Sequence, residues 1–376
     1  MARLTNKRYD VVVVGAGIVG LATAWTARQR GLSVAVMERQ PRSIGASVRN
    51  FGFITVTGQR RGQHWQRARK TLDIWKQIAP EAGIPVVQKG LYVLAQRPEA
   101  VPLIEAFLQT EMGEGCRLLN ARELARDCPA FQPSHGALFS PHECRVESRD
   151  AIPRLAQWLA GSVGVDFYWN TPVIGVTLPL VFTSRGELDA QHCIVCAGHD
   201  FNTLFPGCFD RACLRVSTLQ MMRVDVGGQL RLPGAVMSDL SLVRYEGYAD
   251  LPECQPLRER LKAEQQAYLD DGIHLIAVQS ADGSLVVGDS HVYDVTEVPF
   301  ARSEVDARIL AELRRIMCLP HLEVTERWMG AYASGNDVVF KARPASRVVL
   351  GTVTGGTGAS TSCAFAQELL DEALAS

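Results

Sequence analysis

The sequence lacks both a strong net charge and a long run of apolar residues. Its 376 residues include 39 Lys and Arg against 40 Asp and Glu, a formal net charge of −1. Such a near-neutral chain is poorly suited to binding nucleic acid by neutralising phosphates. The uncharged run at residues 11–27 is shorter than the ~20 apolar residues of a membrane-spanning helix, and glycines interrupt it. We therefore expect a soluble, cytoplasmic protein that contacts neither nucleic acid nor membranes.

The sequence also has few cysteines and no obvious group of metal ligands. Its 10 cysteines are irregularly spaced and too few for a disulfide scaffold. We interpret Cys193 and Cys196, which lie in an apolar run typical of a buried strand, as small core side chains rather than a redox or zinc motif. The histidine pairs lack the spacing of metal ligands, so we predict no metal site. With 47% apolar and 21% charged residues, the composition indicates a folded globular protein.

The N-terminal region carries a nucleotide-binding pattern. A β-branched run at residues 9–14 predicts a strand buried on both faces, and G-A-G-I-V-G follows it at residues 15–20. A helical pattern covers residues 21–30, and residues 33–38 predict a second strand that ends in an acid. This is the G-x-G-x-x-G fingerprint with its strand, helix and acid in the order that dinucleotide binding requires.

Each position of this fingerprint has a physical role. Gly15 permits the tight turn, Gly17 lets a pyrophosphate approach the backbone, and Gly20 lets the helix pack closely on the strand. The helix N-terminus offers N–H groups and a positive dipole end to phosphates. Glu38 can accept hydrogen bonds from ribose hydroxyls and repels a 2′-phosphate. The pattern therefore disfavours NADP but does not separate NAD from FAD.

A second glycine cluster favours a flavin. Residues 347–353 predict a strand, residues 355–360 a glycine-rich turn, and residues 361–374 a final helix. A helix start behind a glycine loop favours negative charge, and a reduced flavin carries negative charge on its pyrimidine edge. A nicotinamide-binding protein has no need for a second loop of this kind. Small residues at 45–47 would also let a flat ring or a phosphate lie against the backbone.

In their order along the chain, these motifs resemble a known enzyme family. The fingerprint, the G-A-S-V-R-N-F-G loop at 45–52, the strand at 194–198 and the G-G-T-G-A-S turn at 355–360 are similar to the superfamily of D-amino-acid, glycine and sarcosine oxidases, which are FAD enzymes. The resemblance implies an α/β, Rossmann-like FAD-binding domain with an inserted α+β substrate domain built on an antiparallel sheet. Sarcosine oxidases attach flavin through a cysteine, but none lies between Trp328 and Lys341, so we expect noncovalent FAD.

The resemblance also implies which residues bind FAD. They lie in the fingerprint, at the end of the second strand, in the loop after it and in three later segments. In chain order they are Gly15, Gly17, Ile18, Val19, Gly20, Glu38, Arg39, Ser47, Val48, Arg49, Asn50, Val173, Ala197, Gly198, Gly356, Thr357, Gly358 and Ala359.

Two features look like a narrower branch of the family. The S-V-R-N-F-G segment at 47–52 followed by Gly58-Gln59, and the G-D-S-H segment at 288–291 together with residues 328–335, resemble oxidoreductases associated with bacterial phosphonate breakdown. These enzymes oxidise amines of the 2-aminoethylphosphonate type. Around Tyr332 the sequence shows no arginine of the kind that grips the substrate carboxylate in several amino-acid oxidases. This argues against a plain amino-acid substrate.

The cofactor segments are scattered along the chain, so the substrate domain must be inserted between them. Within that second domain, Asp282-Gly283 between two β-branched runs predicts a hairpin. We predict an FAD-binding domain formed by residues 1–80, 145–218 and 335–376, and a substrate domain formed by residues 81–144 and 219–334.

These patterns predict an FAD-dependent amine oxidase or dehydrogenase. It would oxidise the C–N bond of a small polar amine to an imine that hydrolyses to an aldehyde or keto product, with O₂ or another acceptor reoxidising the flavin. The alternatives are a glycine or D-amino-acid oxidase, an NAD-dependent dehydrogenase, and a flavin-binding protein without turnover of its own. A homo-oligomer is compatible with all of them.

Four residues are candidates for the substrate pocket. Arg49 could meet an anionic group or the flavin, Trp328 and Tyr332 could wall the cavity, and His291 follows a strand end. Each has a plainer interpretation as an ion-paired arginine, a core aromatic or a strand-capping histidine. A site that binds the neutral amine requires no protein base, so we name no general base.

Overall fold

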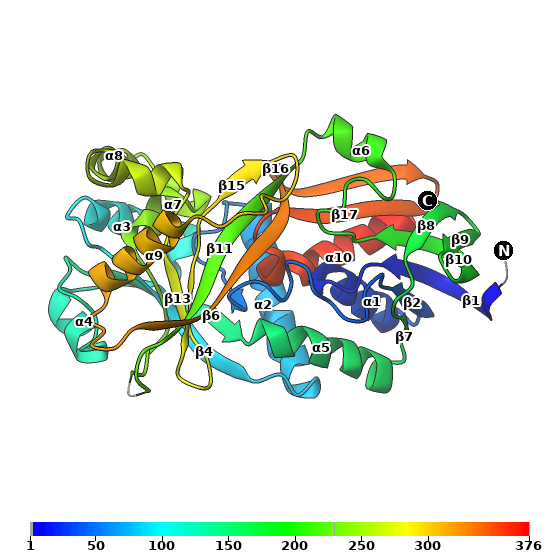
Figure 1. The fold of residues 1–376 in the computed structure, drawn as a ribbon, viewed down its shortest axis with the longest axis horizontal. Coiled ribbons are helices and arrows are strands. Elements are labelled where there is room, and N and C mark those ends of the chain that lie inside the picture. The colour runs from blue at the N-terminus through cyan, green and yellow to red at the C-terminus, as the bar shows by residue number, and fades with distance from the viewer. Residues whose placement is uncertain (1–2, 229, 376) are drawn as a thin grey trace.

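The longest strand of the computed structural model, β16 (Glu323–Ala345), runs from one half of the molecule into the other (Figure 1). The structure describes residues 3–228 and 230–375. Residues 323–334 of β16 pair with β11 (Arg215–Asp225), and its last residues pair with β17 (Val348–Gly355). Both pairings are antiparallel, so the strands of the two halves form one continuous hydrogen-bonded network.

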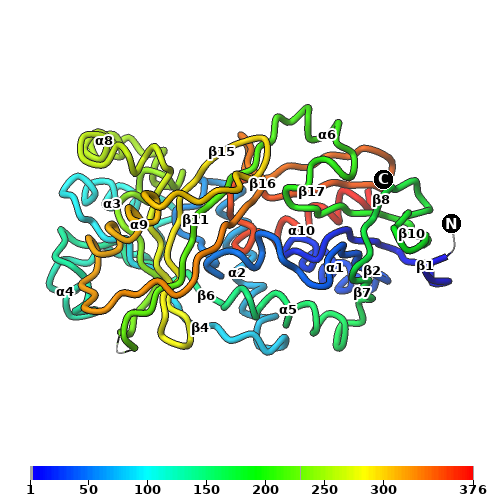
Figure 2. The backbone as a smooth tube through the Cα atoms, viewed as in Figure 1, coloured from blue at the N-terminus to red at the C-terminus, as the bar shows by residue number. Residues whose placement is uncertain are grey.

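The half that contains the first and last elements is a mostly parallel sheet flanked by helices (Figures 1 and 2). Its strands run in the order β7–β2–β1–β10–β17, all parallel, with β16 antiparallel at the edge. The first part of β10 also pairs with β9, and β9 pairs with β8, both antiparallel. The four valines at 11–14 are buried, as expected for a strand covered on both faces. The elements are β1 (Arg3–Val14), α1 (Ile18–Gln29), β2 (Val34–Met37), α2 (Gln63–Glu81), α5 (Ser148–Trp158), β7 (Asp166–Tyr168), β8 (Val173–Thr177), β9 (Leu180–Thr183), β10 (Gly186–Val195), α6 (Pro206–Arg211) and α10 (Gly358–Leu374).

The other half is built mainly from antiparallel strands in the order β11–β14–β13–β12–β4–β6. Only the β4–β12 pair is parallel among the pairs of this half that the structure describes. Helices α3, α8 and α9 lie on its outer side (Figure 1). The elements are β3 (Phe53–Ile54), β4 (Val86–Leu94), α3 (Ala100–Leu108), β5 (Arg117–Leu119), α4 (Ala121–Asp127), β6 (Ala137–Val146), β12 (Ala235–Met237), η3 (Asp239–Val243), α7 (Glu246–Ala249), α8 (Cys254–Asp270), β13 (Ile276–Gln279), β14 (Leu285–Gly288), β15 (Val292–Asp294) and α9 (Ser303–Ile316).

Three of the domain borders predicted from the sequence fall inside strands. The borders at 144/145, 218/219 and 334/335 lie within β6, β11 and β16. At these three borders the chain runs along extended strands rather than through loops, and a strand interior gives no compositional signal of a border; the fourth border, at 80/81, falls at the end of α2. The division into an FAD-binding and a substrate domain remains a prediction.

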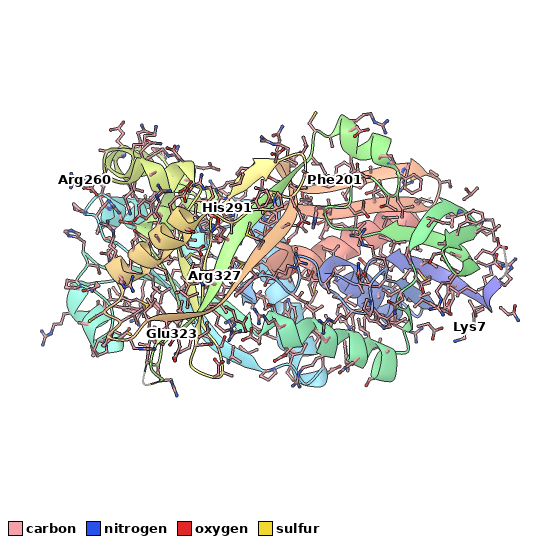
Figure 3. The ribbon with its side chains drawn as sticks, in the orientation of Figure 1. Lys7, Phe201, Arg260, His291, Glu323 and Arg327 are labelled. Carbon is pink, nitrogen blue, oxygen red and sulfur yellow. The ribbon has the colours of Figure 1, made fainter. Side chains whose placement is uncertain are left out.

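The hairpin predicted at Asp282-Gly283 is present. It joins β13 to β14, Ile276 pairs with Gly288, and the Asp282 carboxylate accepts a hydrogen bond from the Ser284 N–H at 2.9 Å. Gly283 has a φ of +88°, which favours glycine at this turn. The hairpin therefore carries the G-D-S-H segment at 288–291 back toward the centre of the molecule, where Figure 3 shows His291.

The described residues include no helix that is both long and apolar enough to cross a membrane. All ten cysteines are free thiols, and Cys193 and Cys196 are buried in the sheet. Burial raises the pKa of both thiols to about 12, which keeps them protonated and unreactive.

Candidate functional site

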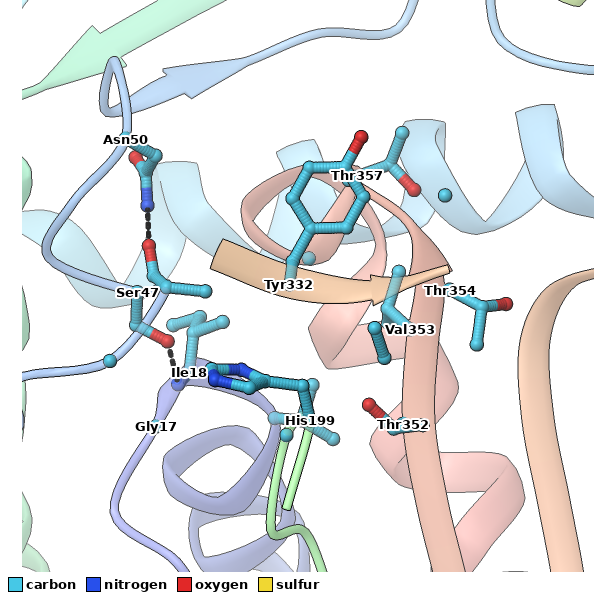
Figure 4. A pocket seen from close by; sticks show the side chains of 18 of the residues that line it. Gly17, Ile18, Ser47, Asn50, His199, Tyr332, Thr352, Val353, Thr354 and Thr357 are labelled. Atoms are coloured by element: carbon cyan, nitrogen blue, oxygen red, sulfur yellow. Dashed lines mark hydrogen bonds between the residues drawn. The ribbon is translucent and has the colours of Figure 1, made fainter. Parts of the chain in front are cut away.

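A cavity of about 670 Å³ opens where the carboxyl ends of the parallel strands meet β16. Its walls come from both halves of the molecule: the turn before α1, the loop after β2, the segment after β10 and the turn before α10 on one side, and η3 to α7, β14 to β15 and β16 on the other. Open α/β sheets bind ligands at this edge. Figure 4 shows the end of the cavity near α1 and α10.

The start of α1 leaves a helix N-terminus open to this cavity. Gly15 has a φ of +102°, and a Cβ there would lie 2.5 Å from the carbonyl oxygen of Cys196. The Ile18 N–H donates a hydrogen bond to Ser47 Oγ at 2.9 Å (Figure 4). The first turn of α1 contains no acidic residue, and no side chain caps it at Gly17. The positive end of the helix dipole is therefore available to a phosphate.

Glu38 is held rigidly at the end of β2. Its Oε2 accepts a hydrogen bond from the Ala16 N–H at 2.8 Å, and its Oε1 accepts one from the Gln40 N–H at 3.0 Å. Both oxygens keep further lone pairs for a diol. The neighbouring Arg39 forms an ion pair with Asp200 at 2.7 Å. The fingerprint thus has the geometry that its sequence predicts.

The start of α10 presents a second open N-terminus to the same cavity. No acidic residue lies in its first turn, and no side chain caps it at Thr357. Gly356 has a φ of +72°, and a Cβ there would meet the Tyr332 ring at 2.9 Å. The Thr357 hydroxyl lies 3.0 Å from His64 Nε2, and burial lowers the pKa of His64 to about 4, so this ring is neutral. The two glycine turns, far apart in sequence, therefore face one cavity.

Most of the residues predicted to bind FAD line the cavity. Two do not: Gly20 packs against the turn, where a Cβ would lie 1.9 Å from the Gly15 carbonyl oxygen, and Val48 packs on the core. Those that line it are Gly15, Gly17, Ile18, Val19, Glu38, Arg39, Ser47, Arg49, Asn50, Val173, Ala197, Gly198, Gly356, Thr357, Gly358 and Ala359.

Three of the four candidate substrate residues, Arg49, His291 and Tyr332, also line the cavity. Trp328 lies outside the lining. Its indole N–H donates to the Arg49 carbonyl oxygen at 3.3 Å, and the Arg149 guanidinium lies 4.8 Å from its ring centre. Trp328 therefore supports the loop that carries Arg49.

Sequence reasoning missed Arg244, which follows η3 and lines the cavity. Its Nη2 donates to the Tyr293 hydroxyl at 2.7 Å. Among the described residues, no carboxylate lies within 4.0 Å of its guanidinium nitrogens, which leaves donors for an anion. The sequence showed no arginine around Tyr332, but the fold places the Arg244 charge close enough to influence the pKa of that phenol. No local motif marks Arg244, because a short 3₁₀ turn carries it to the cavity.

A second unpredicted feature is a buried cluster of His274, Asp289 and His291. One ring nitrogen of each histidine and one carboxylate oxygen of Asp289 all lie within 4.8 Å of one another. His274 Nε2 is 3.0 Å from Asp289 Oδ1, and His291 Nε2 is 3.8 Å from Asp289 Oδ2. Tyr245 packs edge-on against His274, and Tyr293 and Tyr332 lie beside His291. Sequence reasoning did not bring these three residues together, because the β13–β14 hairpin assembles them; the prediction of no metal site stays a prediction.

The electrostatics of this cluster favour an ionised carboxylate and neutral imidazoles. Burial acts to raise the pKa of Asp289, but the interactions with His291, His274 and Arg244, including a hydrogen bond from His274, lower it to about 2. Burial lowers the pKa of His291 well below its usual value, and Arg244 lowers it further. Burial also lowers the pKa of His274. At neutral pH the cluster therefore offers acceptors rather than acids.

Comparison with known proteins points in the same direction as the geometry. A family model described as "FAD dependent oxidoreductase" matches residues 10–372. Sarcosine oxidase subunit beta of an Arthrobacter species is 28% identical over 219 residues, which is 52% of each chain. L-2-hydroxyglutarate dehydrogenase of Indibacter alkaliphilus is 26% identical over 206 residues, 50% of each. The chain thus spans about half the length of these relatives.

Two solved structures share the fold over nearly the whole chain. Glycine oxidase from Bacillus cereus superposes with a TM-score of 0.78 at 19% identity and covers 98% of this chain and 95% of its own. L-proline dehydrogenase from P. horikoshii superposes with a TM-score of 0.79 at 17% identity and covers 98% and 93%. At these identities the likeness shows the fold alone.

Proposed function

The chain belongs to the family of FAD-dependent oxidoreductases, and on that premise we propose that it oxidises the carbon–nitrogen bond of a small amine that also carries an anionic group. The observation that supports an anionic group on the substrate is Arg244. Its half-buried guanidinium faces the cavity and has no carboxylate partner among the described residues. The proposal that the substrate is an amine is based on the names of similar proteins: sarcosine oxidase subunit beta, glycine oxidase and L-proline dehydrogenase.

The residues around the cavity fit FAD. Gly15 leaves no room for a side chain against Cys196, Glu38 is fixed to receive a ribose, and two helix N-termini are free of acids. We assign the α1 end to the pyrophosphate and the α10 end to the flavin ring. Bound there, FAD supplies the acceptor for the hydride that leaves the substrate carbon. Cys196 is the cysteine that borders the cavity among the described residues, and its raised pKa favours noncovalent binding.

Arg244 would bind the anionic group of the substrate. A guanidinium presents a planar fork of donors that matches a carboxylate, a phosphate or a phosphonate. Glycine, sarcosine, proline and 2-hydroxyglutarate all carry a carboxylate, so an anion-binding group suits each of the named relatives. An amine of the 2-aminoethylphosphonate type meets the same requirement, and we include it in the proposed substrate class. Tyr293, which accepts a hydrogen bond from Arg244, holds the guanidinium in place.

The remaining steps need little from the protein. The imine product hydrolyses to an aldehyde or keto product and an amine or ammonia, and O₂ or another acceptor reoxidises the flavin. The cavity walls supply positioning and exclude bulk water. We propose that residues 81–144 and 219–334 provide most of the substrate side of this cavity.

The test is anaerobic bleaching of the flavin by a panel of compounds. Purified holoenzyme is mixed with glycine, sarcosine, D-alanine, L-proline, 2-aminoethylphosphonate and L-2-hydroxyglutarate, and the loss of flavin absorbance is followed. We expect bleaching by at least one anionic amine and none by its amine-free analogue. Turnover of glycine or D-alanine without 2-aminoethylphosphonate would identify the amino-acid oxidase alternative. Bleaching by the hydroxy acid alone, or by no compound, would reject the proposal.

A further inference from the structure

The buried cluster of His274, Asp289 and His291 has no role in the proposed function so far. Asp289 and His291 are each 6% exposed, and both line the cavity that Arg244 also lines. His274 Nε2 lies 3.0 Å from the buried Asp289 Oδ1, although poorly aligned for a hydrogen bond, and among the described residues no side chain or backbone N–H donates to Asp289 Oδ2. An ionised carboxylate that is buried with an unsatisfied oxygen is costly unless a donor or a cation completes it.

The tautomer of His291 follows from its other contact. His291 Nδ1 lies 2.9 Å from the carbonyl oxygen of Gly272. A carbonyl oxygen only accepts hydrogen bonds, so Nδ1 carries the proton. In the neutral ring Nε2 then has a lone pair, and this lone pair lies 3.8 Å from Asp289 Oδ2. Two acceptors thus stand close together at the cavity wall with no donor between them.

A species that brings both a positive charge and N–H donors would satisfy this arrangement. An alkylammonium group can donate to the carboxylate and to the imidazole at the same time. If the substrate also carries an anion, that anion can lie on Arg244, which borders the same cavity. The site then has a positive end and a negative end, each matched to one end of a short zwitterion.

We propose that Asp289 and His291 form the amine-binding end of the substrate site, where Asp289 holds the ammonium group and His291 Nε2 accepts one of its protons. This inference rests on the proposed function and deepens it. In the step, one N–H bond of the ammonium breaks and an Nε2–H bond forms, while the electron pair stays on the amine nitrogen. The amine thereby gains the lone pair that its oxidation requires, and Asp289 stabilises the imidazolium.

The surroundings of His291 explain how a weak base can take this proton. Arg244 lowers the pKa of His291 in the free site. An anionic group that pairs with Arg244 cancels much of this effect, so the substrate itself makes His291 more basic. The groups that face the cluster from every packed element are Arg244 and Tyr245 after η3, His274 before β13, Asp289 after β14, Tyr293 on β15 and Tyr332 on β16.

A divalent cation is the competing occupant, because two imidazoles and a carboxylate also suit a metal ion. We favour the amine because a divalent cation would place two positive charges beside Arg244, whereas an ammonium places one and the substrate that carries it also brings an anionic group to Arg244. The two occupants differ in a direct way: a metal stays with the purified protein, whereas an amine exchanges.

The first arm of the test measures binding without turnover. Ethylammonium chloride and methylphosphonate are titrated separately into the holoenzyme, and the shift of the flavin spectrum is recorded. We expect Asp289→Asn to weaken ethylammonium binding at least tenfold and to leave methylphosphonate binding unchanged. The second arm uses the variant His291→Gln, and its control is His321→Gln, at an exposed histidine outside the cavity lining. Equal ethylammonium affinity in wild type and Asp289→Asn would overturn the proposal.

The second arm measures the pH dependence of anaerobic flavin reduction with the amine that the panel identifies. In His291→Gln the amine must lose its proton to solvent, so we expect the midpoint of the pH profile to rise by at least one unit. An unchanged profile would reject His291 as the acceptor. If the purified wild-type protein contains a stoichiometric metal that Asp289→Asn lacks, the cluster binds a metal cation rather than an amine, and the proposal is rejected. If no amine in the panel bleaches wild type, the proposed function fails, while the binding arm still decides whether the cluster holds ammonium.

Discussion

The two ends of the cavity are built in different ways. The end that we propose for the cofactor consists of two strand–turn–helix units, in which residues that act together are neighbours in the sequence. The end that we propose for the substrate gathers Arg244, Asp289, His291 and Tyr332 from a 3₁₀ turn, a hairpin end and a long strand. The first end owes its shape to backbone geometry, and the second owes its chemistry to side chains. Substitutions should therefore separate cofactor loading from substrate use.

The largest expected effect is at the cofactor end. Gly15→Val places a β-branched side chain at a φ of +102° with its Cβ 2.5 Å from the Cys196 carbonyl oxygen. We expect the FAD content of the purified protein to fall below about a tenth of the wild-type value, because the turn that admits the pyrophosphate cannot form. The flavin-to-protein absorbance ratio measures this, and circular dichroism checks the fold. Gly161→Ala, where an added Cβ meets nothing within 4 Å, is the matched control.

The next effect is at the substrate end and should leave the cofactor in place. Arg244→Met removes the guanidinium but keeps much of the apolar stem. We expect kcat/KM for the anionic amine to fall by roughly 10²–10³-fold, the size of a lost charge-assisted contact, with unchanged FAD content. Arg185→Met, in an exposed turn, is the control. A loss of FAD in Arg244→Met would show that the two ends are not separable.

The smallest effect concerns the cofactor half away from the cavity. The Asp10 carboxylate accepts hydrogen bonds from the Ser33 N–H and hydroxyl at 2.8 and 2.7 Å, and these bonds lower the pKa of Asp10. A lowered folded-state pKa gives stability that is present above the unfolded value of 3.8 and is lost as the pH falls through the folded value. We expect Asp10→Asn to cost about 1 kcal/mol of unfolding free energy at pH 7 and less near pH 3. Urea unfolding at both pH values measures this, and equal losses would contradict it.

The sequence was informative where function depends on neighbours along the chain. The fingerprint, the second glycine turn and the Asp282-Gly283 hairpin could all be predicted, because turn residues and β-branched runs act locally. Arg244 could not, since its approach to Tyr332 depends on tertiary packing alone. The histidine cluster lies between these cases. The register of the hairpin, extended past its last pair, places His274 opposite Ser290 and thus next to His291, so the hairpin alone brings the two histidines close together.

The long strand β16 also limits how the cavity can open. Its first part is hydrogen-bonded to β11 and its last part to β17, so bending of β16 within either part would break backbone hydrogen bonds. Between these two antiparallel ladders, residues 335–338 have no ladder partner, and they border the cavity. Along β16, a change in the angle between the two halves that keeps these ladder bonds must therefore be taken up by residues 335–338. Backbone pairing constrains the wall of the cavity least at this stretch.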